Sequence, residues 1–314
     1  MSLRPGSPAI VVVGSLNRDY VCTVDRLPGP GETRLGTELT LWCGGKGGNQ
    51  AVAAARVGVE LGVGVAMVGA VGDDADGAAL LEGLRDAAVE VSDVAVRPHV
   101  RSGAALITVA DDGENSIVVA PGANRTVEAA DVVAALRRRA LSVVVVQGEL
   151  PAPVVAAAIG EAERLGARPV LNLAPVIELD ESVIRLCDPL VVNEREAGAL
   201  LGDAGSGTDL EPAALALAAR ARSVVVTGGA RGAWTAAGSR VDHVPSRPAT
   251  VVDTTGAGDA FTGALAVGLA LGHGLTRAAT WGAAVAAYSV GRPGAQASFP
   301  RGPEVGLDQS GDVP

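Results

Sequence analysis

The sequence predicts an α/β protein in which a doubly wound, mainly parallel sheet is flanked by helices, with a small β-sheet inserted as a lid. Three observations lead to this prediction. Short apolar runs recur without polar alternation, which is typical of strands buried on both faces of a parallel sheet. Ala-rich segments separate these runs, so strand and helix alternate along the chain. Two early stretches break the alternation and resemble β-hairpins.

The apolar runs give the expected strands. The first, Ile-Val-Val-Val at residues 10–13, directly precedes Gly14. Its side chains leave no polar face, so this strand is expected in the interior of the sheet. Further runs of the same kind lie at residues 104–109, 143–146, 170–173, 190–192 and 224–227.

The Ala-rich segments give the expected helices. Two of them follow glycine-dense turns, at residues 50–57 and 257–271. Helices that alternate with buried strands are expected to cover both faces of the sheet. The complete set lies at residues 50–57, 77–87, 129–139, 153–165, 194–201, 211–221, 257–271 and 276–290.

The two hairpin-like stretches predict the inserted sheet. Residues 18–43 contain Pro-Gly-Pro-Gly at 28–31, and residues 100–120 contain Asp-Asp-Gly-Glu-Asn at 111–115. Turn residues of this kind between strand-like runs indicate hairpins without a crossover helix. Since ligands bind beyond the carboxyl ends of strands in an open parallel sheet, the insertion is expected to serve as a lid there.

Length and composition suit one large domain. The chain has 314 residues, is 48% hydrophobic and has only 2% aromatic residues, so Ala, Val and Leu must fill the core. A domain of about 300 residues buries about three quarters of its unfolded surface. We expect one domain over residues 9–300, with flexible tails at residues 1–8 and 302–314.

Charge and cysteine usage exclude several classes of protein. A net charge of -10 argues against a nucleic-acid partner, and the one basic run, at residues 137–139, is interpreted as a solvated helix end. Local amides and cations can still bind ATP. Cys22, Cys43 and Cys187 show no CxxC spacing, and no apolar stretch is long enough for a membrane span. A soluble, cytoplasmic protein is expected.

Residues 253–259, Asp-Thr-Thr-Gly-Ala-Gly-Asp, form the most informative motif. Its glycines bracket a turn before a helix, and freed amides at a helix N-terminus bind anions such as a phosphoryl group. Asp259 stands where it can accept a proton. Alone, the motif equally suits a capped turn. A second glycine cluster, at residues 44–50, favours close approach of backbone to ligands.

Polar residues follow the expected strands at their carboxyl ends. If the sheet is parallel, all of them face one edge, which is then the active site. They are Asn17, Asp19, Glu149, Asn172, Asn193, Glu196 and the segment 227–229.

These motifs resemble those of the PfkB family of carbohydrate kinases, over about residues 10–300. The clusters at residues 44–51 and 253–261 are similar to the two signatures of that family and stand in the same order. Further similar segments lie at residues 14–19, 172–175, 193–197 and 294–296. Within the family, the chain most resembles the members that phosphorylate ribose.

The resemblance implies roles on the sugar side. Asp259 resembles the catalytic base that takes the proton of the sugar 5-hydroxyl, as well as a substrate-binding residue. Gly256, Ala257 and Gly258 resemble the anion hole that stabilises the transferring phosphoryl group. The implied sugar-binding residues are Asn17, Asp19, Gly45, Lys46, Asn49 and Glu149.

The resemblance also implies nucleotide and cation sites. ATP-binding positions match Asn193, Glu196, Thr227, Gly229, Gly232, Gly258 and Ala283, with Glu196 linked to Mg2+ and phosphate. A K+ site beside the anion hole matches Asp253, Thr255, Ser289, Arg292, Gly294 and Ser298. Two positions depart from the family pattern. Ala283 replaces a polar residue that is common beside the adenine, and Arg18 replaces a small residue.

The implied activity is ATP-dependent phosphorylation of D-ribose at O5, by a homodimer formed through the lids and activated by Mg2+ and K+. Other family activities, on fructose, deoxyribose, a keto-sugar acid or a nucleoside, stay open. A catalytically silent sugar sensor is a further alternative, and an oxidoreductase is a distant one. The glycines at residues 62–64 and 69–72 do not form a dinucleotide fingerprint, and no P-loop motif occurs.

Overall fold

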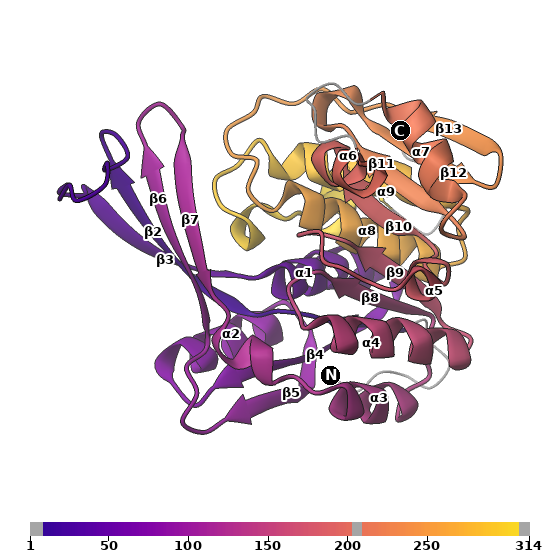
Figure 1. The fold of residues 1–314 in the computed structure, drawn as a ribbon, viewed down its shortest axis with the longest axis horizontal. Coiled ribbons are helices and arrows are strands. Elements are labelled where there is room, and N and C mark those ends of the chain that lie inside the picture. Colours follow the sequence, from indigo (N-terminus) through magenta and orange to yellow (C-terminus); the bar gives the residue numbers. More distant parts are fainter. Residues whose placement is uncertain (1–8, 203–208, 308–314) are drawn as a thin grey trace.

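The computed structural model describes residues 9–202 and 209–307. Within them, nine strands form one twisted sheet in the order β13-β12-β11-β10-β9-β8-β1-β4-β5 (Figure 1). All neighbours from β11 to β5 pair in parallel, and β12 and β13 add an antiparallel hairpin at one end. The strands are β1 (Ala9–Val13), β4 (Gly64–Gly72), β5 (Glu90–Arg97), β8 (Val143–Gln147), β9 (Arg168–Asn172), β10 (Leu190–Asn193), β11 (Val224–Thr227), β12 (Ala233–Ala237) and β13 (Arg240–Val244).

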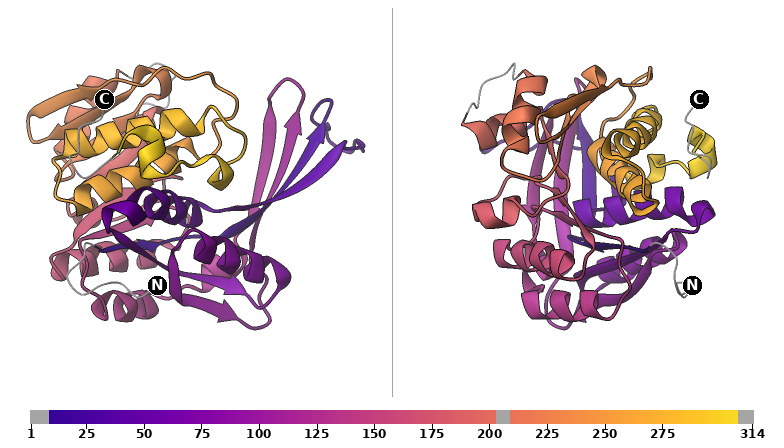
Figure 2. Two further views of the ribbon diagram at one scale, coloured as in Figure 1. Left: turned by 180° about the vertical axis from the view of Figure 1, so that it is seen from behind. Right: turned by 90° about the vertical axis from the view of Figure 1, so that its right-hand side faces the viewer.

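Helices cover both faces of the sheet (Figure 2). One face packs against α1 (Lys46–Gly58), α2 (Ala75–Asp86), α8 (Ala257–Ala270) and α9 (Leu275–Ser289). The other packs against α3 (Ala129–Arg137), α4 (Ala152–Arg164), α5 (Glu181–Ile184), α6 (Glu194–Leu201) and α7 (Leu210–Ala218). Consecutive residues of a strand point to opposite faces, so Ile10 and Val11 of β1 belong to different cores.

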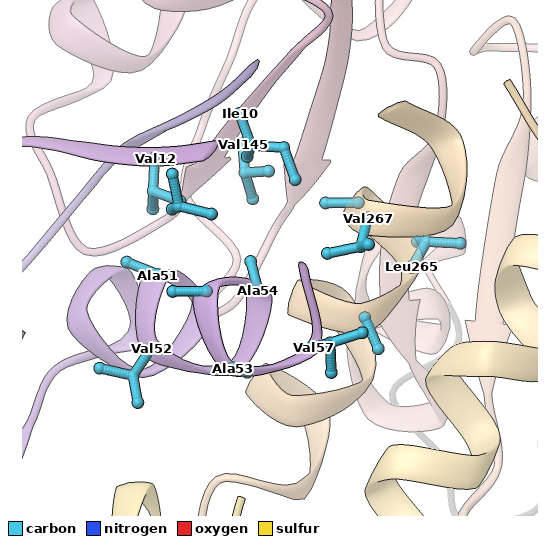
Figure 3. Close-up of a cluster of buried hydrophobic side chains, with 14 of the residues drawn as sticks. Ile10, Val12, Ala51, Val52, Ala53, Ala54, Val57, Val145, Leu265 and Val267 are labelled. Atoms are coloured by element: carbon cyan, nitrogen blue, oxygen red, sulfur yellow. The ribbon is translucent and has the colours of Figure 1, made fainter. Parts of the chain in front are cut away.

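Small residues let α1 and α8 approach each other closely. Ala51 and Ala54 of α1 face Ile10 and Val12 of β1, and Leu265 and Val267 belong to the neighbouring helix α8 (Figure 3). A Cβ atom on Gly263 of α8 would lie 2.7 Å from the Cβ atom of Ala53. This contact brings the N-terminal ends of the two helices together.

A second sheet, here called the small sheet, projects from the main body (Figures 1 and 2). Within the described residues it has four strands in the order β3-β2-β6-β7, namely β2 (Asn17–Val24), β3 (Glu38–Gly44), β6 (Gly103–Ala110) and β7 (Asn115–Ala120). Because β2 follows β1 after only three residues, the two sheets meet at residues 14–16. The predicted fold class, a mainly parallel α/β sheet with a second small sheet, is confirmed.

The pairing register of the small sheet defines its two faces. Tyr20 lies opposite Leu41 and Leu106, and Leu106 lies opposite Val118, so these side chains form one row across the sheet. Leu41, Leu106 and Val118 are 40%, 55% and 62% exposed. Asp19 and its partner Trp42 belong to the opposite face. One face of the small sheet therefore presents an apolar row to the solvent.

The sequence did not predict every element. β4 and β5 were missed, because glycines interrupt the apolar run of β4, although Gly69 lies in a strand that pairs on both sides. A Cβ atom there would lie 2.8 Å from the Gly14 carbonyl oxygen, so the strand needs a glycine. The β12–β13 hairpin was also missed. The run at 104–109 lies in the small sheet, in agreement with the hairpin predicted over residues 100–120.

The expected C-terminal tail needs a correction. Residues Gly302–Val305 form a 3-10 helix, and Val305 and Leu307 are buried in the core that contains α1. These apolar side chains hold the segment on the protein, so it is not a flexible tail up to residue 307. Residues 1–8 and 308–314, for which tails were also predicted, lie outside the described residues.

Candidate active site

Asp259 lies at the third residue of α8, and it is only 5% exposed. Its Oδ2 accepts a 2.9 Å hydrogen bond from Asn49 Nδ2, and its Oδ1 accepts one of 2.9 Å from Gln50 Nε2. Both donors stand in the first turns of α1. The close packing of α1 on α8 therefore fixes both oxygens of this carboxylate.

The N-terminus of α8 is open for an anion. Gly256 caps the helix with φ of 74°, a conformation that favours glycine, and its Cβ would lie 2.7 Å from the Cβ of Ala295. No described atom lies within 4 Å of the position where Gly258 would carry a Cβ. The first amides of a helix have no intrahelical partner, and the dipole adds positive potential there. The chemistry of this helix start suits a phosphoryl group.

Asn17 begins the small sheet and is almost fully buried. Its Oδ1 accepts a 2.8 Å hydrogen bond from Asn124 Nδ2. Asn124 also contacts the backbone of Leu16, whose N–H donates to Asn124 Oδ1 over 2.9 Å. Asn124 therefore leaves the amide nitrogen of Asn17 available as a donor. No sequence pattern had singled out Asn124, which lies in a 3-10 turn at Gly122–Thr126.

Asp19 and Glu149, both predicted to bind the sugar, form an acidic pair. Burial, and then the nearby Glu149 carboxylate, raise the pKa of Asp19 to about 7 against the opposing influence of Arg18. Glu149 accepts hydrogen bonds from the Ser15 hydroxyl and, over 3.0 Å, from the backbone N–H of Lys46. The pair can accept hydrogen bonds from a polyhydroxylated ligand.

Lys46 supplies a cation to this cluster of acids. The Asp259 carboxylate, followed by Glu149 and Glu196, raises the pKa of Lys46 despite its burial. Gly45, directly before it, has φ of 81°, and a Cβ there would lie 2.8 Å from the Asn17 nitrogen. The glycine turn thus brings Lys46 into the acidic site without displacing Asn17.

On the other side of the α8 N-terminus lies a pocket of about 550 Å³. Its size suits a small organic ligand such as a nucleoside. Five predicted ATP-binding residues line it: Thr227, Gly229, Gly232, Gly258 and Ala283. The part of the wall formed by α8 and α9 is apolar and consists of Phe261 and small residues such as Ala283 and Ala286.

Asn193 and Glu196, also predicted for ATP and Mg2+, do not line that pocket. They form a capping box at the start of α6, in which Asn193 N donates to Glu196 Oε2 over 2.8 Å and Glu196 N donates to Asn193 Oδ1 over 2.9 Å. Asn193 lies opposite Thr227 in the β10–β11 register, next to the pocket. Burial raises the pKa of Glu196, although Asn193 and Lys46 oppose the shift.

Three of the residues predicted for K+, namely Asp253, Thr255 and Gly294, are in contact just before α8. Asp253 Oδ2 accepts a 2.8 Å hydrogen bond from Gly294 N, and Asp253 Oδ1 accepts one of 2.8 Å from Thr255 N. Burial acts to raise the pKa of Asp253, but the hydrogen bonds from Thr255 and Gly294 outweigh it and lower the pKa. Arg292 points away, with its guanidinium over the Tyr288 ring at 3.6 Å, so only its carbonyl can act as a ligand.

The donor set suits a monovalent cation better than a divalent one. The hydroxyls of Ser289 and Ser298 are buried and donate to the carbonyls of Ala286 and Ala295, so their oxygens can act as acceptors. Carbonyl and hydroxyl oxygens with one carboxylate replace a K+ hydration shell well. Within residues 9–202 and 209–307, no group of three or more His, Cys, Asp and Glu could hold a metal ion.

Several residues at the site had been given no role from the sequence. Ser15 contacts Glu149, and Gln50 contacts Asp259. Gln147 and Asn172 end neighbouring parallel strands, so the rule that found the other strand-end residues also points to Gln147. The three histidines of the chain take no part in this site. Of the described helices, none is long and apolar enough to cross a membrane.

Comparison with known proteins gives consistent matches. The model of the pfkB family carbohydrate kinases matches residues 7–301. The ribokinase of Schizosaccharomyces pombe is 37% identical over 301 residues, covering 93% of this chain and 94% of that protein. The ribokinase of Bacillus subtilis is 38% identical over 297 residues, covering 94% and 97%. The structure of Arabidopsis thaliana ribokinase complexed with ribose and ATP is 29% identical, covers 95% of this chain and 97% of that chain, and gives a TM-score of 0.85.

Proposed function

The chain belongs to the pfkB family of carbohydrate kinases, and from this membership we propose that it transfers the γ-phosphoryl group of ATP to O5 of D-ribose. The observation that carries the proposal is the position of Asp259. Its carboxylate stands at the anion-binding start of α8, with the acidic, hydroxyl-binding cluster on one side and the 550 Å³ pocket on the other. The products are D-ribose 5-phosphate and ADP.

Asp259 acts as the general base. Its Oδ1 is turned toward the fully buried Gln50, so Oδ2 takes the proton of the ribose 5-hydroxyl. The O5 oxygen then bonds to the γ-phosphorus while the bond from that phosphorus to the bridging oxygen breaks, and ADP leaves with the electron pair. The amides of residues 256–258 stabilise the charge on the transferring group, and a reaction of this kind requires mainly positioning and electrostatics.

The sugar is held by side chains from both sheets. Asn17 has a free amide donor, whereas Asp19 and Glu149 accept hydrogen bonds from hydroxyls. The remaining contacts to the sugar come from the glycine turn and the start of α1, through Gly45, Lys46 and Asn49. A site that pairs each hydroxyl rejects analogues that lack one, because its own buried groups are then left unpaired.

ATP binds in the 550 Å³ pocket, with its base against Ala283 and its triphosphate directed to the start of α8. Glu196 has one carboxylate oxygen outside the capping box, which suits an ion such as Mg2+ that keeps most of its waters. That ion would arrive with ATP and offset its phosphate charge. K+ would bind through Asp253, Thr255, Ser289, Arg292, Gly294 and Ser298.

We also propose that the small sheet is a lid and that it forms a homodimer through its apolar face. Leu41, Leu106 and Val118 form an exposed row that a second copy would cover, and exposed apolar patches of this kind mark interaction surfaces. A reducing compartment such as the cytoplasm suits the cysteines, because Cys22, Cys43 and Cys187 all have free thiols.

A sugar panel tests the proposed activity. ADP release would be measured with D-ribose, 2-deoxyribose, fructose, a keto-sugar acid and a nucleoside, each with ATP and Mg2+. The proposal requires the highest kcat/KM with ribose. A higher kcat/KM with another acceptor would show that this acceptor, and not ribose, is the substrate. Binding of ribose without ADP release would indicate a sugar sensor.

A further inference from the structure

Three buried amide side chains lie beneath Asp259 and away from the sugar-binding cluster. Gln50 and Gln147 are completely buried, and Asn172 is 7% exposed. They come from α1 and from the ends of the neighbouring strands β8 and β9, where Gln147 and Asn172 are paired. None of them was assigned a function above.

The hydrogen bonds of these amides have a defined direction. Gln50 Nε2 donates to Asp259 Oδ1 and to Asn172 Oδ1, both over 2.9 Å. Gln147 Nε2 donates to Gln50 Oε1 over 2.8 Å. An ionised carboxylate is an acceptor only, so Gln50 must present its NH2 group to Asp259 and its carbonyl to Gln147.

Asn172 supports the same orientation of Gln50. Its Nδ2 donates over 3.1 Å to the Val191 carbonyl of β10, which leaves Oδ1 to accept from Gln50. Both hydrogens of the Gln50 amide thus have acceptors, and its oxygen has a donor. A flipped Gln50 would put its oxygen against the oxygens of Asp259 and Asn172.

The orientation of Gln147 places its Oε1 away from Gln50. Its Oε1 is buried, and no described group donates a hydrogen bond to it. The space around this oxygen is available only because residue 14 is glycine, since a Cβ there would lie 2.0 Å from Oε1.

We propose that Gln50, oriented by Gln147 and Asn172, is a positioning residue that holds the Asp259 carboxylate turned for proton transfer. This inference rests on the proposed role of Asp259 as the base. A low-polarity surrounding strengthens the hydrogen bond from Gln50, so the amide fixes the orientation of the carboxylate. A neutral amide does this without adding a buried charge.

The proposal gives different roles to Asn49 and Gln50, the two residues that donate hydrogen bonds to Asp259. Asn49 contacts Oδ2, the oxygen proposed to take the proton, and is itself one of the proposed sugar-binding residues. Gln50 contacts Oδ1 from the closed side, where no sugar reaches. A substitution of Gln50 should therefore affect proton transfer and leave sugar binding nearly unchanged.

The test compares Gln50→Met and Gln147→Met with Val52→Ala. Methionine keeps the length of glutamine and removes its polar groups. Val52 is a buried residue of the same helix that contacts none of these amides, so its truncation controls for a loss of stability. All variants would be compared with the wild type for thermal unfolding, ribose affinity by calorimetry, and kcat.

For Gln50→Met we expect kcat to fall by about 10- to 100-fold, as is typical when an outer partner of a reacting group is lost. The ribose Kd should change by less than about threefold, because Gln50 does not contact the sugar. Gln147→Met should lower kcat to a smaller extent. A kcat equal to that of Val52→Ala would overturn the proposal.

A second measurement keeps this inference separate from the proposed function. The 13C resonance of the Asp259 carboxyl, identified by its loss in Asp259→Asn, would be recorded at one pH in the wild type, Gln50→Met and Val52→Ala. The inference requires that the resonance moves in Gln50→Met and stays in place in Val52→Ala, whether or not ribose is the substrate. An unmoved resonance in Gln50→Met would refute it, while absence of ribose turnover in the wild type would refute only the proposed activity.

Discussion

Asn49 and Asp259 are 210 residues apart in the chain, yet the Asn49 amide donates a 2.9 Å hydrogen bond to the Asp259 carboxylate. Each residue belongs to one of the two glycine motifs that the sequence singled out. The hydrogen bond therefore joins the two motifs into one site, and a change in either should affect the other.

Asp259→Asn should abolish phosphoryl transfer. The amide cannot take the hydroxyl proton, and loss of a general base lowers kcat by about 100- to 10,000-fold. Ribose should still bind, because Asn17, Asp19 and Glu149 are unchanged. ADP release and calorimetric titration with ribose measure the two effects, and a near-normal kcat would exclude Asp259 as the base.

Ribose binding should weaken as the pH falls below about 7. The pKa of Asp19 is about 7, so below that pH it becomes protonated and loses capacity as an acceptor. We expect the ribose KM to rise between pH 8 and pH 6. The control is Asp19→Asn, for which KM should be higher and should vary less over this range.

Asp19 also makes the stability of the fold depend on pH, in the direction opposite to that of ribose binding. Between the ordinary pKa of Asp, 3.8, and about 7, the folded protein holds a proton on Asp19 that the unfolded chain has released. The contribution of Asp19 to stability therefore decreases as the pH rises through this window. Asp19→Asn should raise the Tm at pH 8 relative to the wild type and raise it less at pH 5, as measured by calorimetry.

K+ should activate the enzyme more than Na+ does. The oxygens around Asp253 and Ser298 adjoin the start of α8, so an ion of suitable size would order the anion hole. Rates would be measured in KCl, NaCl and LiCl at the same ionic strength. Equal kcat values in the three salts would contradict the proposed cation site.

Gly263→Val should separate α1 from α8. Its Cβ would lie 2.7 Å from the Ala53 Cβ, and overpacking of this kind costs about 1 to 3 kcal/mol. The free energy of unfolding in urea should fall by that amount, and kcat should fall as Asn49 and Gln50 move from Asp259. Gly160→Ala is the control, since no described atom lies within 4 Å of its added Cβ in α4. It should stabilise the helix by about 0.5 to 1 kcal/mol.

Leu106→Glu should produce monomers. A charge in the middle of the apolar row cannot be covered by a second copy without loss of its solvation. Light scattering after size-exclusion chromatography measures the mass. Val96→Glu provides the matched control, because Val96 is a similarly exposed residue, 49%, on β5 of the main sheet. A wild-type monomer would exclude the proposed dimer.

The sequence predicted the fold class because the parallel strands β1, β8, β10 and β11 are short, unbroken runs rich in Val. The strands it missed have a different composition. Gly69 interrupts the apolar run of β4, and β5 alternates with charged residues because it lies at the edge of the sheet. Local pattern cannot distinguish such strands from loops.

The candidate site was predicted through short motifs, and its supporting residues were not. Asn124 and Gln147 act through contacts with residues more than 90 positions away, which no local pattern encodes. The predicted roles of the site residues await the experiments above. Residues near a glycine motif were easier to predict, because a backbone conformation that requires glycine is visible in the sequence.

The position of Trp42 opposite Asp19 in the small sheet gives the protein an intrinsic fluorescent probe. The indole is 40% exposed and stands on the sugar-facing side, whereas Trp281 is fully buried in the core. The third tryptophan, Trp234, lies in β12 of the main sheet, away from Asp19. Emission that changes with added ribose would therefore come mainly from Trp42, while Trp234 and Trp281 report on unfolding. Sugar arrival and loss of the fold can therefore be followed separately by fluorescence, without a label.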